Sequence, residues 1–235
     1  MDFKLSFIWD ILPEVAAAIP MTLLLTVFPV AVGAVIGFFI ALLRIKKPPV
    51  IYQLTGLYIS FFRSVPLIIL LFCSYYGIPK LINFVFYGGN RVIGASSIPP
   101  LVIALIVLTL YSSAYITELI RGALSSVDMK QMEAAHSIGM TKRDSYLRII
   151  IPQAIIVALP NYFNFVLSTL KNTSVVFTIS VMDMMATAKL AAEDGYRFIE
   201  AYVLVGVLYI IIGFASERLF KNVERNAKRH LGVEV

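Results

Sequence analysis

Cysteine and histidine are nearly missing from this chain of 235 residues, which has one cysteine and two histidines. A single cysteine, Cys73, excludes an intramolecular disulfide and a cysteine metal site. His136 and His230 stand far apart, without the spacing of metal ligands. The sequence also lacks a Gly-x-x-x-x-Gly-Lys-Ser/Thr loop, which would cradle the phosphates of a nucleotide. We therefore expect no bound metal, no ATP site in this chain and no covalent catalysis.

Charge is scarce as well, because Asp, Glu, Lys and Arg make up only 14% of the sequence. Residues 15–43 and 92–117 carry no charge at all. Each run exceeds the roughly 20 residues that an apolar helix needs to cross a bilayer. The runs are too continuous for barrel strands, which alternate in polarity over about 10 residues. Only helices and closed barrels span lipid, so the sequence predicts an all-α integral membrane protein.

The apolar pattern predicts five core transmembrane helices, at residues 19–43, 50–76, 99–120, 152–170 and 198–216. Arg63 and Pro66 interrupt the second, and a loop with Gly89, Asn90 and Arg91 follows it. The fourth region, which contains Pro152 and Pro160, is expected to hold one span, with or without a following half-helix. The expected domains are an external N-terminal segment (1–18), a transmembrane domain (19–217) that includes a polar loop (121–148), and a tail (218–235).

Lysine and arginine are unequally divided between the two predicted sides of the membrane, 13 against 5. The richer side comprises residues 44–47, the polar loop and the tail. The poorer side holds Lys4, Lys80, Arg91, Lys189 and Arg197. Because basic loops are retained in the cytoplasm, the polar loop and the C-terminus are predicted to be cytoplasmic and the N-terminus external. This retention also accounts for the net charge of +6 without a nucleic-acid partner.

The polar loop has the signals of two helices joined by a glycine turn. Asp128 can cap a first helix, with residues 129–131 in its first turn, and Gly139 can end it in a left-handed conformation. Thr141 and Asp144 have the spacing of a capping box for a second helix. Small and apolar side chains of the first helix are expected to form one face, namely Ala134, Ala135 and Ile138. From these patterns alone, a docking loop and an amphipathic connector lying on the bilayer remain equally open.

Several motifs resemble one family of membrane proteins. Glu133-Ala134-Ala135, Gly139 and then Ile151-Pro152 resemble the EAA loop of permease subunits of ABC importers. Three further segments resemble the polar amino-acid subfamily: Phe62-Arg63-Ser64-Val65-Pro66-Leu67 (F-R-G-T-P-L), Ala114-Tyr115 with Glu118 and Arg121-Gly122-Ala123 (A-Y-x-x-E-x-x-R-G-A), and Lys171-Asn172-Thr173-Ser174 (K-D-T-S). Departures are Ser64-Val65 for Gly-Thr, Asn172 for Asp, and Asp128-Met129-Lys130 for a glycine-containing turn.

The resemblance implies a type I (MetI-like) importer fold in a bacterial inner membrane. It implies that Glu133, Ala134, Ala135 and Gly139 couple the chain to an ATPase, which is present in two copies and binds the ATP. Further implied partners are a second permease, either another copy or a paralogue, and an extracellular binding protein. The implied substrate is a polar amino acid. The loss of acid at Asn172 favours a cystine-like or glutamine-like molecule over a purely cationic one.

Polar residues within apolar segments are candidates for the substrate pathway, because such residues usually face a cavity or a partner. The candidates are Arg63, Asn161, Asn164, Lys171, Asn172 and Ser174. Each has a structural alternative: a helix break or subunit interface for Arg63, helix packing for the asparagines, and snorkelling or an intersubunit pair for Lys171. Glu118 is expected to pair with Arg121 on the same helix, three residues away.

Two other functions remain open from the sequence. An ion-gradient-driven secondary transporter or channel would need acids near mid-membrane, and Glu118 and Asp183 are the candidates nearest to such positions. A scaffold subunit that does not transport would use the loop only to recruit a partner. Separately, Gly33 and Gly37 have the spacing that permits close packing of helices.

Overall fold

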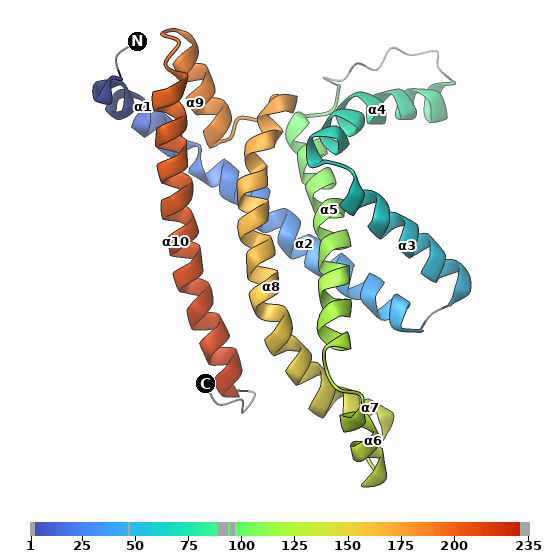
Figure 1. Ribbon diagram of the computed structural model, residues 1–235. Helices are drawn as coiled ribbons and strands as arrows, with labels where there is room; N and C mark the ends of the chain where they lie inside the picture. The colour runs from blue at the N-terminus through green and yellow to red at the C-terminus, as the bar shows by residue number, and fades with distance from the viewer. Residues whose placement is uncertain (1–2, 47, 89–93, 95–96, 231–235) are drawn as a thin grey trace.

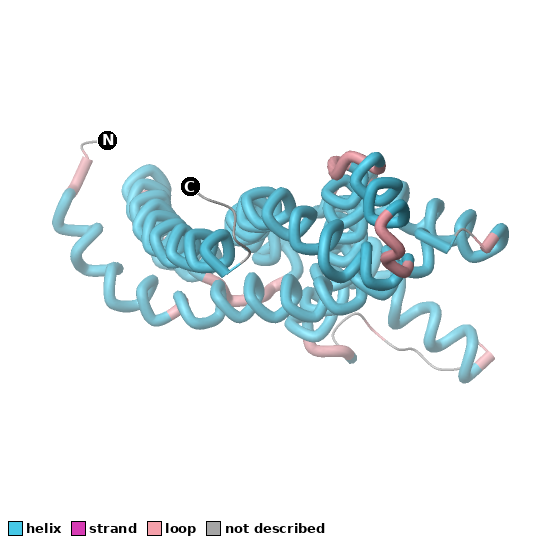
Figure 2. The backbone as a smooth tube through the Cα atoms, turned by 90° about the horizontal axis from the view of Figure 1, so that it is seen from below, coloured by secondary structure: helices cyan, strands magenta, loops and turns pink. Residues whose placement is uncertain are grey.

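The computed structural model describes residues 3–46, 48–88, 94 and 97–230, and their regular secondary structure is entirely helical. The α-helices are α1 (Leu5–Ala17), α2 (Ile19–Lys46), α3 (Pro49–Ser64), α4 (Leu67–Tyr87), α5 (Pro100–Ser125), α6 (Lys130–Ser137), α7 (Lys142–Ser145), α8 (Ile151–Asn172), α9 (Met184–Glu193) and α10 (Phe198–His230). A π-helix, Tyr146–Ile150, precedes α8, and a 3₁₀-helix, Thr173–Ile179, follows it. Figure 2 shows that short connections join most of these helices.

Five helical stretches are long and apolar enough to span a membrane, which confirms the predicted number within the described residues. They are Ile19–Ile45, Leu67–Tyr87, Pro100–Ser125, Lys142–Ile179 and Phe198–Arg229. The predicted bounds of the second span, 50–76, are wrong because this region forms two helices. Pro66 disfavours the helical conformation at the residue before it, and Val65 is extended, with φ −86° and ψ 129°. The loop residues Gly89, Asn90 and Arg91 lie outside the described residues.

α5 lies at the centre of the bundle, and α2 crosses it diagonally (Figure 1). The crossing is close because Gly33 and Gly37 of α2 face α5. A Cβ atom at Gly33 would lie 2.7 Å from Ser112 Cβ, and one at Gly37 would lie 2.9 Å from the Ser113 carbonyl oxygen. The Thr117 hydroxyl also donates to the Gly37 carbonyl oxygen at 3.2 Å. The predicted close packing at these two glycines is therefore a contact within the chain.

An apolar cluster joins α1 to α9 and to the first part of α10. Ile11 and Val15 of α1 pack with Met184 of α9 and Leu204 of α10. The backbone N–H of Lys4 donates to Glu200 at 3.2 Å. The segment 1–18 thus contains a packed helix, and its external position stays a prediction. α10 continues through the predicted boundary at residue 217, and its polar end carries two i,i+4 ion pairs, Glu217–Lys221 and Glu224–Lys228.

Candidate functional site

The polar loop forms a helix–glycine–helix unit that projects beyond the bundle at one end (Figure 1). The N–H of Lys130 donates to Asp128 Oδ1 at 2.9 Å, and α6 starts at Lys130, one residue later than predicted. Gly139 has a φ of +82°, a conformation that glycine adopts without steric cost. Thr141 accepts from the Asp144 N–H at 3.2 Å and donates to Asp144 Oδ2 at 2.6 Å. The predicted Thr141 cap and the glycine turn are confirmed, but the Asp144 carboxylate accepts from the Thr141 hydroxyl and not from the Thr141 backbone N–H, as a capping box requires.

The two sides of α6 differ in burial, and this divides the face predicted from the small residues. Met132 and Ala135 are buried against the bundle. Ala134 and Ile138, four residues apart, are exposed on the outer side, and Ile138 is 80% exposed. The prediction that Ala134 and Ala135 share a face with Ile138 is wrong for Ala135, because neighbouring helical residues point about 100° apart. Glu133 is exposed beside this outer face.

Two sets of contacts fix α6 to the membrane helices. Met132 packs in a small cluster with Ala123 of α5 and Ala154 of α8. The side-chain amides of Gln131 and Gln153 exchange two hydrogen bonds, at 2.6 and 3.2 Å, so α6 is tied directly to the start of α8. The sequence reasoning missed this pair because the two residues are far apart in the chain. These bonds join α6 to α8 across 22 residues of sequence.

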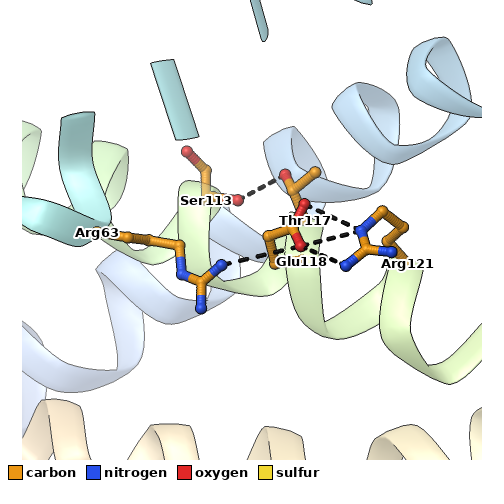
Figure 3. Close-up of polar contacts among 5 residues, drawn as sticks. All are labelled: Arg63, Ser113, Thr117, Glu118 and Arg121. Atoms are coloured by element: carbon orange, nitrogen blue, oxygen red, sulfur yellow. Dashed lines mark hydrogen bonds and ion pairs between the residues drawn. The ribbon is translucent and has the colours of Figure 1, made fainter. Parts of the chain in front are cut away.

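An ion cluster lies where α3 approaches α5 (Figure 3). Arg121 Nη2 lies 2.8 Å from Glu118 Oε2, which confirms the predicted pair three residues apart. Arg121 Nε also donates to both carboxylate oxygens, at 2.9 and 3.1 Å. Arg63, at the end of α3, approaches the same carboxylate at 3.8 Å. Arg63 is therefore the looser of the two partners, and its side chain is 45% exposed.

Two polar cavities border this cluster. One, of about 520 Å³, is lined by residues of α3, α5 and α8, among them Arg63, Tyr115, Glu118, Asn161 and Phe165. The other, of about 430 Å³, shares Arg63 and Glu118 and adds Arg44 and Ser60. The rings of Tyr115 and Phe165 stack with centroids 5.5 Å apart, and the Arg63 guanidinium lies 5.4 Å from the Tyr115 centroid. The first cavity thus combines charge, an amide and aromatic faces.

The structure separates the predicted pathway residues into three sets. Arg63 and Asn161 meet at the first cavity, where the Asn161 amide donates to its own helix, at the Val157 carbonyl oxygen. Asn164 is exposed on α8 but is not among the residues that line that cavity. The others lie at the far end of α8 from the loop and include exposed Lys171, half-buried Asn172, and Ser174, whose hydroxyl donates to the Lys171 carbonyl oxygen at 2.7 Å.

Two aromatic residues at the cavity were not singled out as site candidates from the sequence. Tyr115 precedes Glu118 by three residues on α5, so helical spacing could have identified it. Phe165 could not be assigned in this way, because its partner is on another helix. Within the described ranges, no three His, Cys, Asp or Glu residues cluster as potential metal ligands.

Five apolar helices, a polar cavity between them and a projecting helix–glycine–helix loop, all within the described residues, have the architecture of a transporter permease subunit. The chain belongs to the family described as binding-protein-dependent transport system inner membrane component, which matches residues 33–229. Its fold is that of the MetI-like permeases of type I ABC importers.

Individual relatives cover nearly the whole chain. It is 35% identical to the L-cystine transport system permease protein TcyL of Bacillus subtilis, across 97% of this chain and 93% of the relative. It is 34% identical to the octopine transport system permease protein OccM of Rhizobium radiobacter, across 95% of this chain and 90% of the relative. A crystal structure of an amino acid ABC transporter with histidines superimposes with a TM-score of 0.83 at 30% identity, covering 96% of this chain and 100% of that one.

Proposed function

We propose that this chain is the permease subunit of an ATP-driven importer that carries a polar amino acid into the cell. The observation that carries this proposal is the projecting loop, whose outer face presents Ala134, Ile138 and Glu133. Ala134 and Ile138, one turn apart and both exposed, give this face a small apolar surface outside the membrane spans, where we place the contact with a protein partner. The names of the relatives, which transport cystine or octopine, support an amino acid as the substrate.

Coupling would follow the helical path that leads away from the loop. α7, the π-helix and α8 follow one another without a break from Lys142 to Asn172. A partner that pulls on Glu133, Ala134, Ala135 and Gly139 would therefore also move α8, through this continuity and through the Gln131–Gln153 bonds. α8 carries Asn161 into the polar cavity. Alternating access would result from this rigid connection between the loop and the cavity.

The proposed assembly has two permease subunits, either two copies or a copy and a paralogue, and two ATPase subunits. ATP would bind and be hydrolysed in the ATPases, because this sequence has no phosphate-cradling loop. An extracellular binding protein would deliver the amino acid. The loop and the C-terminus would lie in the cytoplasm and the N-terminus outside, which agrees with the side richer in lysine and arginine. The membrane would be the bacterial inner membrane.

The substrate proposal rests on charge and shape at two places along α8, where residues of α3, α5 and the 3₁₀-helix also contribute. Arg63 can turn from its 3.8 Å contact with Glu118 toward a substrate carboxylate, because Arg121 already neutralises that acid. Asn161, Tyr115 and Phe165 offer an amide and aromatic surface to the rest of the molecule. Lys171, with Asn172, Ser174 and Asn164, would contact the substrate nearer the outer side. Asn172 favours a cystine-like or glutamine-like substrate over a purely cationic one.

The alternative, a secondary transporter or channel driven by an ion gradient, needs an acid that is available to the coupling ion. Glu118 is engaged by Arg121 and Arg63. Asp183 caps α9, where its Oδ1 accepts from the Ala186 N–H at 2.9 Å. Both acids therefore have structural roles, and this favours the ATP-driven proposal. A scaffold without transport would leave the polar cavity unexplained.

The first test is to purify the tagged chain in mild detergent and identify what co-purifies. A stoichiometric ATPase, stimulated by an amino-acid-loaded binding protein, would support the importer. Chain that purifies without an ATPase in several detergents, together with uptake that follows a sodium or proton gradient, would replace it with the alternative.

Charge reversal at the loop tests the coupling role. We expect Glu133→Lys to insert and purify normally but to lose uptake, because the exposed face would present the wrong charge to the ATPase. Glu193→Lys, an exposed acid at the end of α9, is the matched control and should retain uptake. Equal uptake by both variants would contradict the coupling role of the loop.

Truncation at the far end of α8 tests the substrate pathway. We expect Lys171→Ala to raise the concentration of loaded binding protein that half-maximally stimulates ATP hydrolysis. Lys80→Ala, an exposed lysine on α4, should leave this concentration unchanged. If the Lys171 profile matches that of the control, Lys171 is structural only.

A further inference from the structure

An apolar groove lies at the loop end of the bundle, between α2, α5 and α8, apart from the polar cavities. Its volume is about 570 Å³, and its walls include Leu42 of α2, Leu124 of α5 and Ile155 of α8. The groove exists because Ala154 and Ala158 stand where larger side chains would close the gap between α2 and α8. Leu42 and Ile155 are 42% and 43% exposed, so the groove is open along its outer side.

A second cavity, of about 520 Å³, continues the groove toward the loop. Ala41, Ile45, Leu124 and Tyr146 line both spaces, so the two are contiguous. The second space adds Arg44 and Arg121 to its walls, together with Tyr52 and Ser125. No acidic side chain is among the described residues that line it. The combined site is thus apolar over one part and cationic over the other.

Hydrogen bonds and an ion pair hold the two arginines in place and leave one terminal nitrogen of each guanidinium without a partner among the described residues. Arg44 donates through Nη1 to the Tyr52 carbonyl oxygen at 3.3 Å and to Thr55 Oγ1 at 3.2 Å, and it lies 4.4 Å from the centre of the Tyr52 ring. Arg121 uses Nε and Nη2 for Glu118. Arg44 Nη2 and Arg121 Nη1 therefore have capacity for another acceptor.

The charge balance favours an anion at this position. Among the described residues, Glu118 is the one acid that lines the neighbouring polar cavities, and it faces three arginines, Arg44, Arg63 and Arg121. Two positive charges are left uncompensated at this loop end of the bundle, and charged side chains in membrane helices usually face a partner. Basic pockets between membrane helices are suited to anionic lipid head groups. The apolar groove lies next to the arginines, where the acyl chain of a lipid bound by its head group would lie.

We propose that this groove binds one anionic phospholipid, with its phosphate at Arg44 and Arg121 and an acyl chain between α2, α5 and α8. The lipid contacts Tyr146 at the junction with α8 and Met129 just before α6. Lipid in the groove therefore supports the root of the projecting loop. The proposal goes beyond the importer function and does not rest on it, since binding is measured without substrate, ATPase or transport.

The test uses a tryptophan placed in the groove and lipids whose brominated chains quench its fluorescence. Trp9 is the single native tryptophan and lies on α1, so Trp9→Phe provides a silent background. Leu42→Trp reports on the groove. Ile211→Trp on α10, where Ile211 is 56% exposed, reports on ordinary lipid contact. Each variant is reconstituted in phosphatidylcholine vesicles with increasing brominated phosphatidylglycerol, or with brominated phosphatidylcholine.

At Leu42→Trp, we expect half-maximal quenching at a roughly tenfold lower fraction of the glycerol lipid than of the choline lipid, because two arginines favour the anion. Ile211→Trp should not distinguish them. Adding Arg44→Gln to the groove reporter should remove most of the preference. Equal quenching by both lipids at Leu42→Trp, an equal preference at Ile211→Trp, or a preference that survives Arg44→Gln would each overturn the proposal.

Absence of quenching by either lipid would also overturn it, because a second chain or another protein would then fill the groove. Native mass spectrometry of the unaltered protein provides a measurement that does not depend on the folding of an arginine variant. From an equal mixture of the two lipids, we expect one phosphatidylglycerol to remain bound to each chain. Retention of both lipids in equal amounts would contradict the site.

Discussion

A single methyl group at the α2–α5 crossing tests the central packing of the fold. In Gly33→Ala, the new Cβ would lie 2.7 Å from Ser112 Cβ and 3.0 Å from the Ser113 backbone nitrogen. Carbon atoms in contact prefer about 3.5–4.0 Å, so the helices must separate by roughly 1 Å. That separation also stretches the 3.2 Å bond from Thr117 to the Gly37 carbonyl oxygen. Overpacking of this kind costs about 1–3 kcal/mol.

Alanine also has a helix propensity about 1 kcal/mol more favourable than glycine, so a control must remove this gain. Gly206→Ala on α10 is matched, because Gly206 is helical and a Cβ there meets nothing within 4 Å. The difference between the two variants isolates the steric cost. We expect Gly33→Ala to unfold several degrees below Gly206→Ala, at about 2–4 °C per kcal/mol for a chain of this size.

The assay is the temperature at which the purified protein in detergent loses its monodisperse elution profile. The amount of membrane-inserted protein should also be lower for Gly33→Ala than for Gly206→Ala, because a loosened crossing exposes the chain to proteolysis. If the two alanine variants unfold at the same temperature, α2 and α5 do not approach as closely as the contacts of Gly33 require.

Two further predictions concern helix caps. Thr141→Ala removes the acceptor for the Asp144 N–H, at a cost of about 1 kcal/mol. Hydrogen exchange should then accelerate in residues 139–145, while α5 stays protected. Unchanged exchange would show that the cap does not hold the loop. Burial raises the pKa of Asp183 to about 6 from its ordinary 3.8, so the folded state binds an extra proton between these values and its stability falls as the pH rises through that window. Asp183→Asn keeps an acceptor for the Ala186 N–H without the charge, so above pH 6 it should unfold at a higher temperature than the parent protein. This gain in unfolding temperature should shrink toward pH 4. The variant should retain uptake. Lost uptake in a folded Asp183→Asn protein would favour the ion-gradient alternative.

Local signals account for most of the form of the loop. Gly139 and the Thr141–Asp144 pair act on neighbouring backbone groups, so their effect can be predicted from spacing alone. The order of the apolar runs likewise sets the number of membrane helices, because lipid requires each backbone group to be paired within its own segment. The second span was misplaced because hydropathy does not report where Pro66 divides one apolar region into two helices.

Contacts between distant segments are decided by tertiary structure. The sequence by itself determined a helical membrane protein, the number of its spans, the Glu118–Arg121 pair and the glycine turn of the loop, because each depends on residues within a few turns of one another. Only the folded chain brings Arg63 of α3 to Glu118 of α5, places Asn161 at their cavity and leaves Arg44 beside an apolar groove. These contacts between helices depend on the angles at which the helices cross. The crossing angle of α2 and α5 is set by interlocking side-chain shapes and by the room left at Gly33 and Gly37, which no local pattern encodes.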